Sequence, residues 1–205
     1  MPLSSPLPRE PIHTRRIVCD AYRRQDGLID VEGHITDIRP FPYYNHWDQS
    51  VVDGTPIHEM RMRLTINADK RIEAVEVAFD NTPFPHCASC NDHYQRLVGL
   101  TIGAGLGKQV VKAVGGVEGC THVTGMVQIL ATTLFQALAS EVQRVLPNPE
   151  GKSAEQLHLE RSDRINTVFA GSGEPDYSLL NSCYSHAETS PIVKIFAPRF
   201  HQRRK

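Results

Sequence analysis

Two cysteines and two histidines lie close together in the segment PFPHCASCNDHY, residues 83–94. Cys87 and Cys90 have the spacing of one zinc knuckle, and Cys120 with His122 is the only other nearby Cys/His pair. Structural zinc takes four such ligands, often as two pairs, so these residues could form a site of three sulfurs and one nitrogen. Alternatively, Cys87 and Cys120 are small buried hydrophobes, as free cysteines often are. With only one knuckle present, the sequence favours a structured turn in which Cys87 is packed rather than bound to metal.

Ionisable side chains form a second candidate site on two predicted strands, residues 28–38 and 59–67. Their polar rows comprise Asp30, Glu32 and His34 on the first strand, and Glu59, Arg61 and Arg63 on the second. If the strands are neighbours, the simplest interpretation is a solvated face on which cross-strand ion pairs contribute little to stability. If helices or a second subunit cover this face, His34 and His58 can transfer protons there, because imidazole titrates near neutral pH. An arginine of the second row could hold an anionic oxygen.

The proline-bearing stretch RPFPYYNHWDQ (39–49) carries four aromatic residues, namely Phe41, Tyr43, Tyr44 and Trp47. Prolines rule out a central strand, so we expect a loop. The four rings either fold back as a lid on the core or form a wall that stacks against a flat aromatic ligand. In the second case the tyrosine hydroxyls are free to meet phenol oxygens.

The glycine-rich stretch GLTIGAGLGKQV (99–110) fails as a phosphate-binding loop. The GxxxxGK[ST] spacing needs glycine where the chain has Ile102, and serine or threonine where it has Gln109. The GxGxxG spacing needs glycine in place of Lys108. We therefore expect a tight connection and a helix start rather than nucleotide binding.

The bulk composition excludes several classes of protein. The chain has 205 residues, 40% hydrophobic and 22% charged, which suits one domain with a core of its own. The net charge is −1 and no long basic run precedes residue 199, so nucleic acid is not an expected partner. We find no 18-residue apolar window and no signal peptide, so no membrane association is expected. Five cysteines, an odd number, favour a reducing, cytoplasmic location over a disulfide scaffold.

The pattern along the chain predicts an α+β domain. We expect an antiparallel sheet of about four to five strands, including 28–38, 59–67 and 71–80, and a last strand at 191–196. A long helix in the C-terminal half, from Thr121 to Val145, and shorter helices at 92–100 and 106–114 should pack on it. The predicted organisation is an irregular arm (1–12), a core domain (13–147), a surface excursion (148–178) with a short helix near 153–166, and a segment that returns to the core and ends in a basic tail (179–205).

Several of these stretches together resemble a bacterial family catalogued as domain of unknown function 2889. The matching segments are AYRRQDGLIDVEGHITDIRPF (21–41), GTPIHEMRMRLTI (54–66), DNTPFPHC (80–87), YQRLVGLTIGAGLGKQV (94–110), GGVEGCTHVTGMVQILATTLFQ (115–136) and, more weakly, NSCYSHAETSPIVKIFAP (181–198). The resemblance places Cys87, Cys120 and His122 in the family pattern and leaves Cys90 outside it, which weakens the four-ligand metal site. It also implies catabolism of aromatic compounds, with some members acting as lyases that release formaldehyde from lignin-derived phenolic dimers.

The resemblance and the residues together predict a carbon–carbon lyase that needs no cofactor and acts on a small aromatic substrate. We expect His34 or His58 as the base, with Glu32 or Asp37 orienting it. Tyr43 or Tyr44 would bind or protonate a phenolic oxygen, and Arg61 would hold it as phenolate. Further candidates for substrate binding are Phe41, Trp47, Arg63 and His122.

Two other interpretations remain open from the sequence. A metal-binding or iron–sulfur-handling accessory protein would use Cys87, Cys120 and His122 with Cys90 or Cys183, an arrangement with a loose analogy to iron–sulfur scaffold proteins. A non-catalytic module would sequester an aromatic metabolite at the aromatic loop. The polar sheet face and the 148–178 excursion both offer surface for a homodimer.

Overall fold

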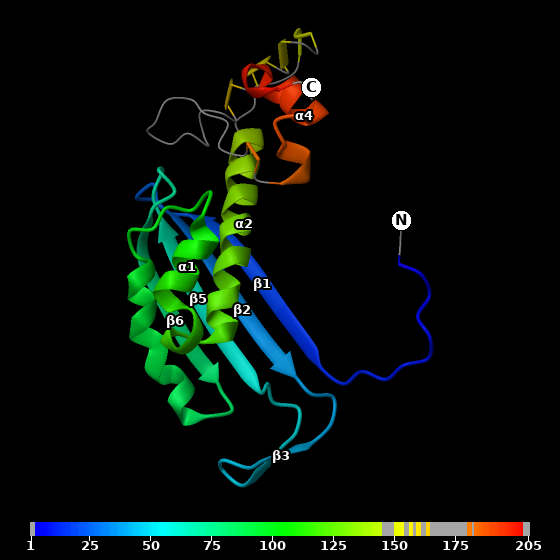
Figure 1. Cartoon of the computed structure of the whole chain (residues 1–205), viewed down its shortest axis with the longest axis vertical. Helices are drawn as coiled ribbons and strands as arrows, with labels where there is room; N and C mark the ends of the chain where they lie inside the picture. The colour runs from blue at the N-terminus through cyan, green and yellow to red at the C-terminus, as the bar shows by residue number, and fades with distance from the viewer. Residues whose placement is uncertain are drawn as a thin grey trace.

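The computed structural model describes residues 3–144, 150–153, 156–157, 159–160, 163–164, 180–181 and 183–202. Four antiparallel strands form the main sheet in the order β1-β2-β5-β6. Their bounds are Thr14–Arg23 for β1, Ile29–Ile38 for β2, His58–Ile66 for β5 and Ile72–Asn81 for β6. A separate two-stranded hairpin, β3 (Tyr43–Asn45) with β4 (Ser50–Val52), connects β2 to β5 and lies beyond one end of the sheet (Figure 1).

The helices follow the sheet in the sequence and cover one of its faces (Figure 1). They are the 3₁₀ helix η1 (Pro85–Leu97), α1 (Leu106–Val114), the 3₁₀ helix η2 (Gly116–Glu118) and α2 (Thr121–Arg144). Towards the C-terminus come η3 (Tyr184–His186), α4 (Pro191–Phe196) and η4 (Pro198–Phe200). The α+β class and the antiparallel sheet predicted from the sequence are confirmed.

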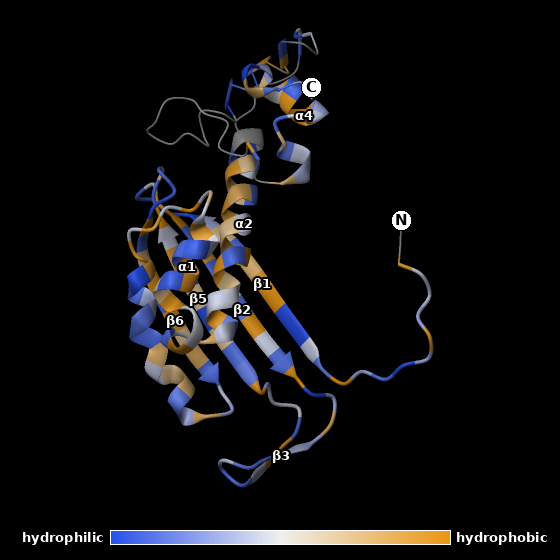
Figure 2. Cartoon of the chain, in the orientation of Figure 1, coloured by the Kyte–Doolittle hydropathy of each residue, from blue (hydrophilic) through white to orange (hydrophobic). Residues whose placement is uncertain are grey.

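Alternating side chains build the core between the sheet and the helices. On β2, Val31 and Ile35 are buried and point to the helices, while Glu32 and His34 point to the opposite face. Helix α2 contributes an apolar stripe at helical spacing that is fully buried at Val123, Met126, Val127, Leu130 and Leu134. Figure 2 shows hydrophobic residues both along α2 and along the strands of the sheet. Most of the domain's hydrophobic stabilisation therefore comes from this one interface.

Gly33 allows α2 to approach the sheet closely. A Cβ atom added at Gly33 would lie 2.8 Å from Sδ of Met126 and 3.0 Å from Cδ2 of Leu130. Both distances are shorter than normal contacts, so a larger residue would push the helix outward. This close packing fixes the position of α2 over β2, and with it the residues at the start of the helix.

Two predictions about secondary structure are wrong. Residues 191–196 form the helix α4 rather than a strand, because Ser190 caps its N-terminus by accepting a hydrogen bond from the Val193 amide, and Pro191 suits the first helical turn. The expected helix over 92–100 is instead the 3₁₀ helix η1, which already starts at Pro85 and ends at Leu97. The predicted helices over 106–114 and from Thr121 onward are confirmed.

The sequence also hid three features of the fold. Strand β1 was not predicted, although it pairs with β2 over its whole length. The aromatic loop contains the short β3–β4 hairpin. By length and composition alone, residues Thr121–Glu141 of α2 could cross a membrane. The expectation that the chain has no 18-residue apolar window is therefore wrong. About a third of this window, 33%, is buried in the domain. Most of the predicted 148–178 excursion and all of residues 203–205 of the tail lie outside the described residues.

Candidate active site

A buried carboxylate lies at the centre of a cluster of basic side chains. Asp37 is near the end of β2, on the face covered by helices, and it is fully buried. In the register of the sheet it pairs with Arg15 on β1 and with His58 on β5. Three adjacent strands therefore bring these side chains together in one row across the sheet.

Both carboxylate oxygens of Asp37 have several partners. The Arg15 guanidinium donates from Nε to Oδ1 at 2.7 Å and from Nη2 to Oδ2 at 2.6 Å. His13 Nε2 lies 3.1 Å from Oδ1, and His58 Nδ1 lies 3.1 Å from Oδ2. His122 Nε2 is 3.5 Å from the same Oδ2. The two-point contact with Arg15 is the strongest of these, since charge-assisted pairs of this kind combine energy with fixed geometry.

His122 reaches the cluster from the first turn of α2. Its ring lies 4.0 Å from that of His58, centroid to centroid, with the planes tilted by 34°. The start of α2 is held by the buried Tyr94 of η1, whose hydroxyl donates to the Cys120 carbonyl at 3.0 Å and accepts from the Cys120 amide at 2.9 Å. Burial raises the pKa of Tyr94 to about 12, so this hydroxyl keeps its proton.

Electrostatics keep Asp37 ionised and the two adjacent histidines neutral. Burial alone raises the pKa of Asp37, but hydrogen bonds from Arg15 and His13 and the nearby positive charges outweigh it, so the pKa lies well below its usual range. Burial lowers the pKa of His58, and the charge of His122 lowers it further, against an opposing effect of Asp37. The pKa of His122 is also lowered, first by burial and then by Arg15.

The ionised carboxylate fixes which ring nitrogens carry protons. A carboxylate only accepts hydrogen bonds, so His58 carries its proton on Nδ1. The negative charge 3.5 Å from His122 Nε2 favours the tautomer of His122 with its proton on that nitrogen. His58 is thus left with a lone pair on Nε2, and His122 with a lone pair on Nδ1, which lies 3.6 Å from Sγ of Cys120. The cluster therefore presents two separate basic nitrogens.

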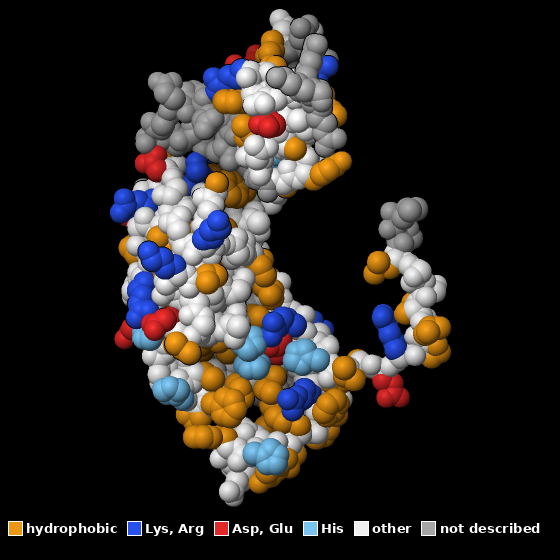
Figure 3. Space-filling view, in the orientation of Figure 1, with side chains coloured by type: hydrophobic (Ala, Val, Ile, Leu, Met, Phe, Trp, Pro, Cys, Tyr) orange, Lys and Arg blue, Asp and Glu red, His pale blue; other side chains and the backbone are white. Residues whose placement is uncertain are grey.

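The side chains of the cluster are open to solvent at one side. His58 and His122 are 19% and 21% exposed, while Arg15 is 45% exposed. Figure 3 shows histidine side chains gathered around a small acidic patch on the helix-bearing face, with an apolar area next to it. Solvent therefore reaches both histidines in this structure.

The aromatic hairpin borders this site by connectivity, because it joins the end of β2, which carries Asp37, to His58, the first residue of β5. Phe41, Tyr44 and Trp47 are largely exposed, so they are not a lid on the core. Trp47 packs edge-on against Phe84, with ring centroids 6.1 Å apart. The ring of Tyr43 lies beneath the Arg39 guanidinium at 4.3 Å.

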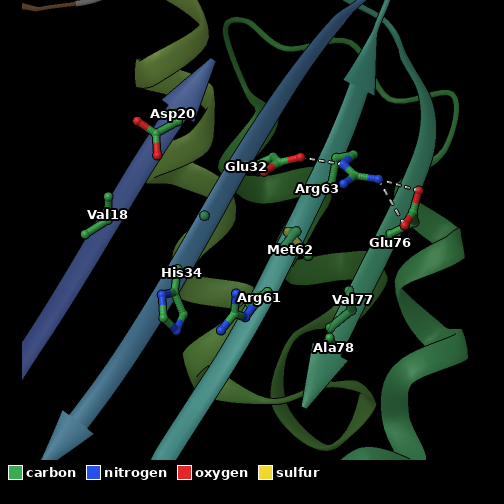
Figure 4. A pocket seen from close by; sticks show the side chains of 11 residues that line it. Val18, Asp20, Glu32, His34, Arg61, Met62, Arg63, Glu76, Val77 and Ala78 are labelled. Carbon is green, nitrogen blue, oxygen red and sulfur yellow. Dashed lines mark hydrogen bonds and ion pairs between the residues drawn. The ribbon is translucent and has the colours of Figure 1, made fainter. Parts of the chain in front are cut away.

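Four of the predicted site residues lie on the opposite face of the sheet. Figure 4 shows His34, Glu32, Arg61 and Arg63 pointing into a shallow hollow of ≈ 510 Å³. His34 contacts Glu59 at 3.0 Å, Arg61 bonds Asp80 at 2.8 Å, and Arg63 bonds Glu32 at 2.7 Å. Because successive residues of a strand face opposite ways, the structure separates these four from Asp37 and His58.

The cysteine region is arranged differently from a zinc knuckle pair. Among the described residues, Asp37, His58 and His122 form the one set of three whose possible ligand atoms all lie within 4.8 Å of one another. Two histidines and a carboxylate suit a divalent transition metal. Here, however, Arg15 occupies both oxygens of Asp37, and its charge opposes a bound cation.

In the cysteine segment, the Cys90 thiol donates a hydrogen bond to the Cys87 carbonyl at 3.3 Å, and burial raises the pKa of Cys90.

Reasoning from the sequence missed Arg15 and His13. His13 directly precedes the unpredicted strand β1, and Arg15 is its second residue. The alternation of TRRIVCDAYR (14–23) is the signal that could have revealed this strand. The sequence left His34 or His58 as the base and Glu32 or Asp37 as its orienting group, and the structure brings Asp37 and His58 together. His122 was named only as a further candidate, since its contact with Asp37 joins residues 85 positions apart.

The fold and site define a two-layer α+β domain with an acid–base cluster on the helix-covered face of the sheet. A family model described as "Protein of unknown function (DUF2889)" matches residues 13–136. The chain belongs to this family. Comparison with curated proteins and with solved structures gives no match. The matched range contains every member of the cluster around Asp37.

Proposed function

We propose that this protein is a lyase that releases formaldehyde from a hydroxymethyl group of a phenolic, lignin-derived compound, without a cofactor, and that His58 is its base. The observation that carries the proposal is the hydrogen bond between His58 Nδ1 and the buried, ionised Asp37, at 3.1 Å. It orients the ring and leaves Nε2 basic, the arrangement in which a carboxylate supports a histidine general base.

The reaction needs few groups from the protein. His58 Nε2 removes the proton of the substrate's hydroxymethyl oxygen, the carbon–carbon bond breaks, and formaldehyde leaves. The electron pair of the broken bond is left on the substrate carbon that carried the hydroxymethyl group, next to the aromatic ring. A proton returned to the organic product completes the balance. Burial lowers the pKa of His58, so the ring is unprotonated at pH 7 and ready for the first step.

Two neighbouring features fit a phenolic substrate. The exposed rings of Tyr44, Trp47 and Phe41 lie in the connection between the two strands that carry the site, and they offer faces for stacking on an aromatic ring. Arg15 is 45% exposed while bound to Asp37, so its guanidinium can also meet a phenolate oxygen. In this proposal Arg15 takes the role that the sequence suggested for Arg61, which lies on the other face.

The experiment that tests the proposal measures formaldehyde release across a panel of phenolic dimers. We expect His58→Asn to lower turnover by about 100-fold or more, the usual contribution of a general base. His93→Asn is the matched control, since His93 is a partly exposed histidine on η1 bonded to the Glu118 carbonyl. A comparable loss in His34→Asn, with none in His58→Asn, would place the chemistry on the outer sheet face instead. Saturable binding of a phenol without product would indicate a binding module.

A further inference from the structure

We infer that Cys120, His122 and Asp37 form a thiol–imidazole–carboxylate relay, and that Cys120 is a nucleophile that reversibly captures a small aldehyde. The aldehyde we assign is formaldehyde, so its identity rests on the proposed function, while the relay itself does not. Two contacts connect the three side chains. Cys120 Sγ lies 3.6 Å from His122 Nδ1, and His122 Nε2 lies 3.5 Å from Asp37 Oδ2.

The geometry gives each member of the relay a defined role. Asp37 is buried and is held by Arg15, so it cannot move away from the imidazole. Its negative charge keeps the His122 proton on Nε2, which leaves the lone pair of Nδ1 facing the thiol. A nucleophile next to a base that a third group orients is the pattern of activated cysteines and serines on many folds.

The backbone around Cys120 fixes the position of its side chain at the start of α2. Cys120 directly precedes α2, and its carbonyl accepts the first hydrogen bond of the helix, from the Thr124 amide at 2.9 Å. Tyr94 holds the Cys120 backbone on both its amide and its carbonyl, so the sulfur keeps its place beside His122.

The titratable and charged groups around His122 come from every element that packs on it. They are Arg15 on β1 with His13 just before it, Asp37 on β2, His58 on β5 and Cys120 at its own helix. Arg15 and His13 disfavour protonation of His122, and Asp37 favours it. The neutral imidazole that results is able to accept the thiol proton.

The capture step is balanced without any oxidant or reductant. The Cys120 thiol gives its proton to His122 Nδ1, and the sulfur attacks the carbon of formaldehyde. A carbon–sulfur bond forms while the carbonyl π pair moves to oxygen, which takes the proton back from His122. The product is S-hydroxymethylcysteine, a hemithioacetal that reverts by the same route. Such a thiol would hold formaldehyde briefly next to the base that generates it.

The test uses the full chain without any phenolic substrate, mixed with ¹³C-formaldehyde and followed by ¹³C NMR. We expect a hemithioacetal signal that disappears in Cys120→Ser and persists in Cys19→Ser. Cys19 is the matched control because it is also a partly buried thiol, and burial raises its pKa. A signal that survives in Cys120→Ser would overturn the inference.

A second readout keeps the inference falsifiable if Cys120→Ser fails to fold. Iodoacetamide alkylation of each cysteine, mapped by mass spectrometry at pH 7, should be faster at Cys120 than at Cys19. His122→Asn should slow alkylation of Cys120 by about tenfold or more, because the base that takes the thiol proton is lost. An unchanged rate would refute the relay.

The outcomes separate this inference from the proposed function. A reactive Cys120 in a protein that releases no formaldehyde from any phenol would keep the relay and refute the lyase. Release of formaldehyde by a protein whose Cys120 is unreactive would refute only the relay.

Discussion

Replacing Asp37 by asparagine should destabilise the domain and disturb both histidines next to it. The substitution keeps the volume of the side chain but removes the charge that binds Arg15 at 2.6 and 2.7 Å. Breaking a buried ion pair costs about 3–5 kcal/mol, because one charge is left without a partner in the interior. Here Arg15 is 45% exposed and can be hydrated, so we expect a smaller loss, about 2–3 kcal/mol. For a chain of this size that corresponds to a fall in Tm of about 4–12 °C.

The same variant should lower the pKa of His58 and His122. Asp37 raises both values in the wild type, against the stronger effect of burial, so removing its charge leaves the lowering unopposed. Their folded pKa values lie below the unfolded value of about 6.5, so the stability that the neutral rings contribute is complete above that pH. It is lost as the pH falls through the folded pKa values, and in Asp37→Asn the loss extends to lower pH.

Urea unfolding between pH 5 and 8 and NMR titration of the imidazole signals test this reasoning. Asp80→Asn is the matched control, since Asp80 pairs with Arg61 on the open face of the sheet, where both side chains are well exposed. Its effect on the free energy of unfolding should stay within about 0.5 kcal/mol. An Asp37→Asn variant as stable as the wild type, or histidine pKa values that rise, would refute the electrostatic account of the site.

Two further predictions concern the packing that positions the site. Gly33→Ala places a methyl group 2.8 Å from Sδ of Met126 and should cost about 1–3 kcal/mol in thermal unfolding, whereas Gly125→Ala, where the added atom meets nothing, should stabilise α2 by about 0.5–1 kcal/mol. Equal effects of the two would contradict the close approach of α2 to β2. Tyr94→Phe leaves the Cys120 amide and carbonyl without their hydroxyl partner and should cost about 1–3 kcal/mol, with Tyr184→Phe, at an exposed position, as the neutral control.

Local patterns in the sequence were sufficient for most elements of the fold. The period of two along residues 28–38 and 59–67 and the spacing of three and four after Thr121 follow from the geometry of strands and helices, so they are readable without tertiary contacts. The same reasoning failed at 191–196, where an apolar, β-branched run was taken for a strand. There the Ser190 cap and Pro191 outweigh the β propensity of the segment.

The candidate site, like the fold, could be predicted only in part from the sequence. From residue types alone, His34 and His58 were equal candidates for the base, and Glu32 and Asp37 were equal candidates for the group that orients it. The sequence could not tell that Asp37 faces the helices while Glu32 and His34 face outward, since that depends on which side of the sheet is covered. Only the tertiary structure brought Arg15 and His122 to the same carboxylate, through strand pairing and the packing of α2. Those contacts are made between residues far apart in the chain, and no local pattern of residues encodes them.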